Sequence, residues 1–233
     1  MKPVKQLWVI LKKDILMEMR TKEMIVSMLL FVMLTMIIFN YAFRADRNDL
    51  TPFGGGLLWL AFIYTAFLGM NRSFVHEKDQ GCLEGLLLSP VDRSIIYVAK
   101  MAGNLIFISA VELAAIPIFT IFFISVPYYM SLDKLGVFLL GLVLSNIGIA
   151  AVGTFVATLA VNTSRRDLLL PILGLPLLMP VVAPAVIISG AVLSGSTNKN
   201  EWDLVYESLK ILAAYDIIFF VVIAMIYDFI LGE

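Results

Sequence analysis

Few side chains in this sequence could do chemistry, and the most reactive ones lie in one polar stretch. The 233 residues include a single histidine, His76, and a single cysteine, Cys82, both within 76–100. One His and one Cys cannot form a Cys/His metal cluster, and no nucleophile has an adjacent base and orienting partner. A phosphate-binding Gly-x-x-x-x-Gly-Lys-Ser/Thr loop is missing too. The triple glycine at 54–56 has no following Lys and is interpreted as a flexible lead-in to an apolar run. The sequence therefore predicts no enzyme active site.

The polar stretch instead predicts a helical corner. Leu83, Leu86 and Leu87 stand at i, i+3 and i+4, which is typical of a short helix with one apolar side. Ser89 and Pro90 suit the N-cap and the first position of a second helix. A corner of this kind could dock in a groove of a soluble domain and carry its movement into the neighbouring apolar helices. The alternative is an interfacial helix without a partner, and the residues alone leave both open.

The second helix of this corner is expected to continue into the next apolar run. Asp92 would complete a partial capping box after Ser89. Ile95, Ile96 and Val98 would then lie along the helix as it enters the membrane.

Apolar runs dominate the rest of the chain. Hydrophobic residues make up 61% of the sequence and charged residues 15%, whereas soluble domains are about 45–50% apolar and about 25% charged. A helix needs about 20 apolar residues to cross a bilayer. Six stretches qualify, at about 24–43, 53–71, 101–126, 135–161, 168–193 and 211–231. We expect one all-α membrane domain, 1–233, with six transmembrane helices.

The basic residues predict the orientation of this domain. If the N-terminus is cytoplasmic, twelve of the 17 Lys and Arg residues fall in cytoplasmic segments. Such a bias is typical of membrane proteins, so both termini and the polar stretch 76–100 are expected in the cytoplasm. The formal net charge of −1 gives no reason to expect a nucleic-acid partner.

Two amphipathic segments flank the spans. Residues 1–22 are expected to form a helix lying on the membrane, with a plain cytosolic lead-in as the alternative. Its apolar stripe consists of Val4, Leu7, Trp8, Leu11, Ile15 and Met19. Within 196–210, a short helix in the outer leaflet is expected, with an ordinary loop as the alternative. Its apolar positions are Trp202, Val205, Tyr206 and Leu209.

The fourth and fifth spans have unusual compositions. Small residues four apart in the fourth span predict close helix packing within the subunit. These pairs are Gly141 and Ser145, Ala150 and Thr154, and Gly153 and Ala157. The fifth span carries four prolines, which remove backbone donors and tend to kink a helix. They are Pro171, Pro176, Pro180 and Pro184. This span is expected inside the assembly, either near a conduction path or merely kinked.

Three polar residues stand out within the apolar runs. Glu112 and Asn146 lie inside the third and fourth spans, and Asp216 lies near one end of the last. Ionisable groups at membrane depth are costly and usually face a partner or a cavity. Glu112 is expected to be protonated or to bond across helices to Asn or Ser. Both a functional role and a role in helix packing stay open.

The polar stretch also resembles a known signature. It contains Glu77-x-x-x-Gly81-Cys82-Leu83-Glu84-x-Leu86-Leu87-Leu88-Ser89-Pro90-x-x-Arg93, followed by Ala99-Lys100. This pattern is similar to the segment between spans two and three in membrane subunits of type-2 ABC exporters. The resemblance implies that the residues coupling to an ATPase are Glu77, Gly81, Leu83, Glu84, Leu86, Leu87, Ser89, Pro90 and Arg93. Cys82 stands where such proteins commonly have Ser or Thr.

The second half of the chain resembles one branch of that class, the CcmB family of haem-exporter subunits in cytochrome c maturation. The resemblance is carried by Arg165-Arg166-Asp167-Leu168-Leu169-Leu170-Pro171, by Leu175-Pro176-Leu177-Leu178-Met179-Pro180 and by the ending from Ala214-Tyr215-Asp216. It implies a type-2 ABC exporter architecture in the bacterial inner membrane, with an N-terminal interfacial helix and a cytoplasmic coupling helix.

The resemblance also implies partners. They are a CcmA-like ATPase that holds the ATP, CcmC- and CcmD-like membrane subunits and a CcmE-like haem chaperone, with two copies of this chain in the complex. Haem would be cargo rather than a bound cofactor, because the only histidine, His76, falls on the cytoplasmic side. We therefore expect energy coupling rather than haem ligation or catalysis. The alternatives are a type-2 ABC exporter for a lipid, glycan or drug, or a membrane scaffold or carrier without an ATPase.

Overall fold

All the secondary structure in the described part of the chain is helical, as the sequence predicts. The computed structural model describes residues 3–42, 53–79, 91–123, 132–161 and 166–230. The helices are α1 (Pro3–Thr21), α2 (Glu23–Ala42), α3 (Gly54–Asp79), α5 (Arg93–Phe123), α6 (Leu132–Val161), α7 (Arg166–Leu193) and α8 (Lys199–Ile230). Five of them, α2, α3, α5, α6 and α7, are long and apolar enough to cross a membrane. The sixth expected span lies within α8 and stays a prediction.

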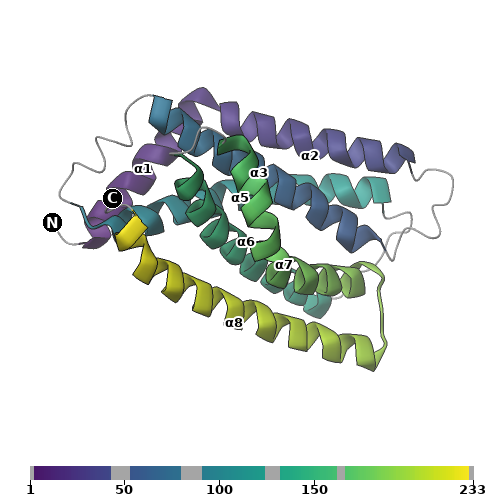
Figure 1. Ribbon diagram of the computed structural model, residues 1–233. Coiled ribbons are helices and arrows are strands. Elements are labelled where there is room, and N and C mark those ends of the chain that lie inside the picture. The colour runs from purple at the N-terminus through teal and green to yellow at the C-terminus, as the bar shows by residue number, and fades with distance from the viewer. Residues whose placement is uncertain (1–2, 43–52, 80–90, 124–131, 162–165, 231–233) are drawn as a thin grey trace.

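The long helices form one bundle around α6. Helix α6 contacts α3, α5, α7 and α8, while α2 packs on α3 and α5 on one side of the bundle. Figure 1 shows α1 crossing one end of the bundle. The end of α3, the start of α5 and the end of α8 lie at that same end (Figure 1). Helix α5, which follows the polar stretch, contacts α1, and α1 also contacts α2.

A sharp corner joins α1 to α2. Lys22 has a φ of 56°, and its amide donates to the carbonyl of Glu18 at 2.7 Å. This left-handed residue with a single backward hydrogen bond is a common way to end a helix, although glycine usually fills the position. The Glu18 carboxylate then accepts the amide of Ile25 at 2.9 Å, which caps the first turn of α2. The angle between the two helices is thus fixed by local bonds.

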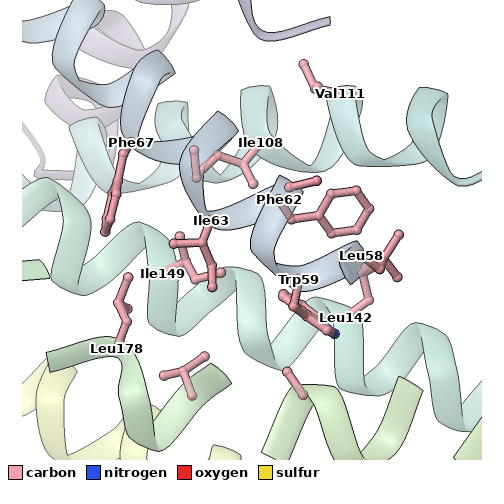
Figure 2. Packing of buried hydrophobic residues seen from close by; sticks show 14 of the residues in the cluster. Leu58, Trp59, Phe62, Ile63, Phe67, Ile108, Val111, Leu142, Ile149 and Leu178 are labelled. Carbon is pink, nitrogen blue, oxygen red and sulfur yellow. The ribbon is translucent and has the colours of Figure 1, made fainter. Parts of the chain in front are cut away.

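The largest apolar cluster is centred on α3. Trp59 and Phe62 are each 1% exposed, and their rings meet edge to face with centroids 5.8 Å apart. Figure 2 shows Ile108 of α5, Ile149 of α6 and Leu178 of α7 converging on this helix. The indole nitrogen of Trp59 donates to Ser189 of α7 at 2.8 Å, so its polar atom is satisfied within the core.

The triple glycine is part of α3 and not the flexible lead-in that the sequence suggested. A Cβ on Gly55 would lie 2.9 Å from both the amide nitrogen of Gly190 and the carbonyl oxygen of Val186. Only a glycine lets the backbones of α3 and α7 approach this closely. A Cβ on Gly56, by contrast, would meet no atom within 4 Å. The sequence showed three glycines but not which of them the packing requires.

The small residues of α6 pack within the chain, as expected. A Cβ at Gly141 would collide with Ile188 of α7, one at Gly153 with Met70 of α3, and one at Gly148 with both Val181 of α7 and Asp216 of α8. Three neighbouring helices therefore lie close to the α6 backbone, and small side chains permit this contact.

Helix α7 contains all four prolines. Figure 1 shows it as a bent helix rather than a straight one, and it contacts α3, α6 and α8. Pro180 leaves the carbonyl of Pro176 without its helical donor. At the adjacent carbonyl, Leu177, the hydroxyl of Tyr215 donates a hydrogen bond from α8. A neighbouring helix thus supplies a donor at the proline bend, as expected for a proline-containing helix inside a membrane protein.

A capped corner separates α7 from α8. Gly195 has a φ of 69°, and the amides of Gly195 and Ser196 bond back to Val192 and Ala191 in a Schellman motif. The side chain of Asn198 then accepts the amide of Asn200 at 3.1 Å and so caps the start of α8.

Helix α8 therefore begins twelve residues before the expected span. The helix expected in 196–210 in place of a loop is confirmed, but it is not a separate short helix. Its apolar positions belong to the first turns of α8, and they are Trp202, Val205, Tyr206 and Leu209. Lys134 of α6 donates to the carbonyls of Gly195 and Ser196, both at 3.1 Å. It also lies 5.8 Å from the ring centroid of Trp202. Side chains from α6 and α8 thus stabilise this end of the bundle.

Candidate coupling end and intramembrane polar cluster

Most of the expected coupling residues lie outside the described part of the chain. These are Gly81, Leu83, Glu84, Leu86, Leu87, Ser89 and Pro90. Glu77 belongs to the last turn of α3, but its side chain is also outside the described part. Arg93, which is partly buried, is the first residue of α5. The expected helical corner over 83–90 therefore stays a prediction.

The start of α5 lies later than the sequence suggested. The carbonyl of Asp92 accepts the amides of Ile95 and Ile96, so Asp92 stands at the N-cap, where Asp is favoured. The expected cap of this helix at Ser89 is wrong. The expectation that the helix runs without a break through Ile95, Ile96 and Val98 into the third span is confirmed.

Helix α1 packs on the start of α5. Ile10 of α1 and Ile96 and Ala99 of α5 form a small buried cluster, with Leu7 and Val91 packed against it. Of the stripe expected to face the membrane, Val4, Trp8 and Met19 are exposed on the surface of the chain, whereas Leu11 is buried against it. The first residues after the polar stretch are therefore held by α1.

A buried ion pair joins α1 to α5. The amine of Lys100 lies 2.8 Å from a carboxylate oxygen of Asp14, and the two residues are 3% and 9% exposed. The other oxygen of Asp14 lies 3.1 Å from Lys13. Buried charges are found in proteins mainly when they are paired, so the packing of α1 on α5 requires this partnership. Asp14 lies one turn after the buried Ile10 and Leu11, and this acid on an apolar face was a signal that the sequence reasoning missed.

Glu112 bonds across to α6, which confirms one of the two expectations for this residue. The amide nitrogen of Asn146 donates to Glu112 at 2.6 Å and approaches the hydroxyl of Ser109 at 3.2 Å. Glu112 and Asn146 are 2% and 0% exposed. The structure therefore brings two of the three predicted polar residues into direct contact.

Asp216 lies opposite the middle of α6. One of its carboxylate oxygens is 2.8 Å from the position that a Cβ on Gly148 would occupy. Because α8 begins at Lys199, Asp216 falls in the middle of the helix. The expectation that it lies near one end of the last span depends on where α8 crosses the membrane and stays a prediction.

Further polar pairs join the central helices. Asn104 of α5 donates to Thr154 of α6 at 2.9 Å, and the hydroxyl of Tyr97 donates to the carbonyl of Ala151 at 3.0 Å. Among the residues that the structure describes, no group of three or more His, Cys, Asp or Glu side chains could hold a metal ion. The polar residues within the bundle are thus mainly cross-helix hydrogen-bond partners.

The sequence of this chain is similar to a family of known membrane proteins. The model of the family described as CcmB protein matches residues 5–230. Heme exporter protein B of Rhodobacter capsulatus is 26% identical over 155 residues, which cover 66% of this chain and 68% of that protein. The protein of the same name from Bradyrhizobium diazoefficiens is 25% identical over 188 residues, or 80% of this chain and 82% of that protein. The one from Pseudomonas aeruginosa is 27% identical over 154 residues, or 66% and 67%.

The match to the family extends over all seven described helices, from the first turn of α1 to the last residue of α8. It therefore includes the N-terminal helix, the polar stretch and the proline-rich helix together. The chain belongs to the CcmB protein family.

Proposed function

We propose that this chain is the membrane subunit of an ABC transporter that serves haem export in cytochrome c maturation. The observation that carries the proposal is the match to the CcmB family over residues 5–230, together with relatives named Heme exporter protein B. The bundle of long apolar helices agrees with a multi-pass membrane protein. ATP would be hydrolysed by a separate partner, so the chain itself is not an enzyme.

The polar stretch is the proposed contact with a CcmA-like ATPase. Its ends are the last turn of α3 and the start of α5, which lie at one end of the bundle (Figure 1). Helix α5 is continuous for 31 residues, about 46 Å at 1.5 Å per residue. A displacement at Arg93 would therefore be carried through the bundle by one helix. The Asp14–Lys100 pair would make α1 move with it.

The corner at Lys22 would extend this movement to α2. Because Glu18 of α1 caps the first turn of α2, a shift of α1 changes the position of the α2 N-terminus. The proposed moving unit is thus α1 with the starts of α2 and α5.

The wider assembly follows from the same proposal. We propose six spans, with α8 as the sixth, in a bacterial inner membrane. An even number of spans puts both termini on the same side, which we propose is the cytoplasm. CcmC- and CcmD-like subunits and a CcmE-like chaperone are the proposed partners, with two copies of this chain per complex. Haem is the proposed cargo and not a ligand of this subunit.

Charge reversal in the polar stretch tests the proposal. We expect Glu84→Lys and Arg93→Glu each to reduce co-purification of the ATPase and cytochrome c maturation, while the chain still accumulates in the membrane. Glu207→Lys is the matched control, because this residue is exposed on the first half of α8, toward the opposite end of the bundle. Normal ATPase recovery together with normal maturation in both variants would refute the coupling role.

A further inference from the structure

Buried oxygen atoms without hydrogen-bond partners gather at one level of the bundle. Among the described residues, five such atoms belong to α5, α6 and α8. They are Oε1 of Glu112, Oγ of Ser145, Oδ1 of Asn146 and both carboxylate oxygens of Asp216. The four side chains are at most 7% exposed. Because buried polar groups nearly always have partners, such a concentration marks this level of the bundle as a candidate binding site.

The geometry of α6 places these atoms at the same depth. Glu112 bonds to Asn146, and Asp216 approaches Gly148. Residues two apart on a helix differ by about 3 Å in height and point in nearly opposite directions. The two carboxyl groups therefore flank α6 on opposite sides, within one turn of each other. Ser145 lies one turn from Gly148 on the side of Asp216.

The missing partner must bring positive charge or hydrogen-bond donors. Four of the five atoms are acceptors, and only the Ser145 hydroxyl can donate. The basic residues nearest along these helices lie elsewhere: Lys100 pairs with Asp14, Lys134 bonds the end of α7, and Lys210 is exposed. Carboxylate, amide and hydroxyl oxygens are the ligands that small hard cations prefer.

We propose that the carboxyl groups of this layer are two cation sites on opposite sides of α6, with a proton or Na⁺ at Asp216 and a proton at Glu112. Asn146 orients Glu112 through its 2.6 Å hydrogen bond. Ser145 is a further oxygen on the Asp216 side. The proposal concerns the chain itself and does not depend on an ATPase partner.

Thermal unfolding of the full chain in lipid nanodiscs tests Na⁺ binding. Samples are compared in NaCl and in choline chloride at equal ionic strength. If Na⁺ is the ligand, the Tm rises with NaCl concentration, because a ligand that binds only the folded state stabilises it. The rise is lost in Asp216→Asn and reduced in Ser145→Ala, whereas it persists in the control Asp203→Asn, which changes an exposed acid on the same helix.

Infrared spectroscopy of the same samples tests the proton. If the proton is the ligand, NaCl does not change the Tm. The wild type then shows the C=O stretching band of a protonated carboxylic acid, which is diminished in Glu112→Gln and in Asp216→Asn but not in Asp203→Asn. Where one variant does not fold, the other carries the test. A wild-type protein with neither a Na⁺-dependent Tm nor a carboxylic-acid band would overturn the proposal.

Discussion

Asp14 and Lys100 form a buried ion pair, and burying either charge without the other would lower the stability of the chain. Removing one partner of such a pair typically costs about 3–5 kcal/mol, whereas replacing both by apolar side chains is often neutral. We expect Asp14→Leu and Lys100→Met each to lower the Tm strongly in thermal unfolding of the chain in nanodiscs. The double variant Asp14→Leu with Lys100→Met is expected to recover much of the loss. Lys12→Gln, which changes an exposed residue of α1, is the control.

If the losses in Tm of the two single variants simply add in the double variant, this account is contradicted. Additive losses would mean that the two side chains do not depend on each other. The sequence marked Lys100 only as the end of the polar stretch. The pairing with Asp14 needed the structure, because the two residues are 86 positions apart.

A substitution at Glu112 can distinguish a role in helix packing from a role in cytochrome c maturation. The amide oxygen of Gln can still accept the hydrogen bond from Asn146, but the side chain no longer carries an ionisable group. We expect Glu112→Gln to reach normal amounts in the membrane and to lower the yield of mature cytochrome c. Glu207→Gln, at an exposed position on α8, is the control. An unchanged yield in Glu112→Gln would assign this residue to helix packing alone.

At the scale of the helices, the apolar runs predicted where most spans lie but not where every helix begins. The starts of α2, α3, α6 and α7 fall within three residues of the expected spans, because the apolar run and the helix nearly coincide there. Helix α8 begins twelve residues before the expected span, because its first turns are amphipathic. Helix α5 begins at Arg93, three residues after the helix start expected at Pro90. Asn198 and Glu201 are the capping signals that could have located the start of α8.

The crossing of α3 and α7 predicts unequal effects for neighbouring glycines. Gly55→Ala would place a methyl group 2.9 Å from backbone atoms of α7, which cannot move as a side chain can. We expect a loss of about 1–3 kcal/mol in the free energy of unfolding, the usual range for overpacking. Gly56→Ala meets nothing within 4 Å and should be neutral or slightly stabilising, since Ala favours a helix. Equal Tm values for the two variants would show that α3 and α7 do not approach at Gly55.

A glycine at the corner between α1 and α2 should raise the stability of the chain. Lys22 adopts a φ of 56°, which costs a residue with a Cβ roughly 1 kcal/mol. We expect Lys22→Gly to raise the Tm in nanodiscs, while Thr21→Gly in the last turn of α1 lowers it by removing helix propensity. A lower Tm for Lys22→Gly would mean that its side chain, rather than its backbone, matters at this corner.

At the scale of the whole molecule, composition determines the class of protein and the structure determines its internal contacts. The 61% hydrophobic content predicted a helical membrane protein, and the bundle agrees with it. Which helix lies at the centre could not be predicted from hydropathy, because α6 is as apolar as its neighbours. Its glycines gave the signal for close packing, but the three helices that they face are brought together only by the fold.

The topology of the chain is the remaining question at this scale, and its single cysteine offers a direct test. If α8 crosses the membrane, Cys82 and the C-terminus lie on the cytoplasmic side and the corner before α8 lies on the other. We expect a membrane-impermeant maleimide to label Cys82 in inside-out vesicles and not in intact spheroplasts. In a Cys82→Ser background, Gly232→Cys should behave in the same way, whereas Thr197→Cys, at an exposed position, should be labelled in spheroplasts. Labelling of positions 197 and 232 from the same side would mean that α8 does not cross.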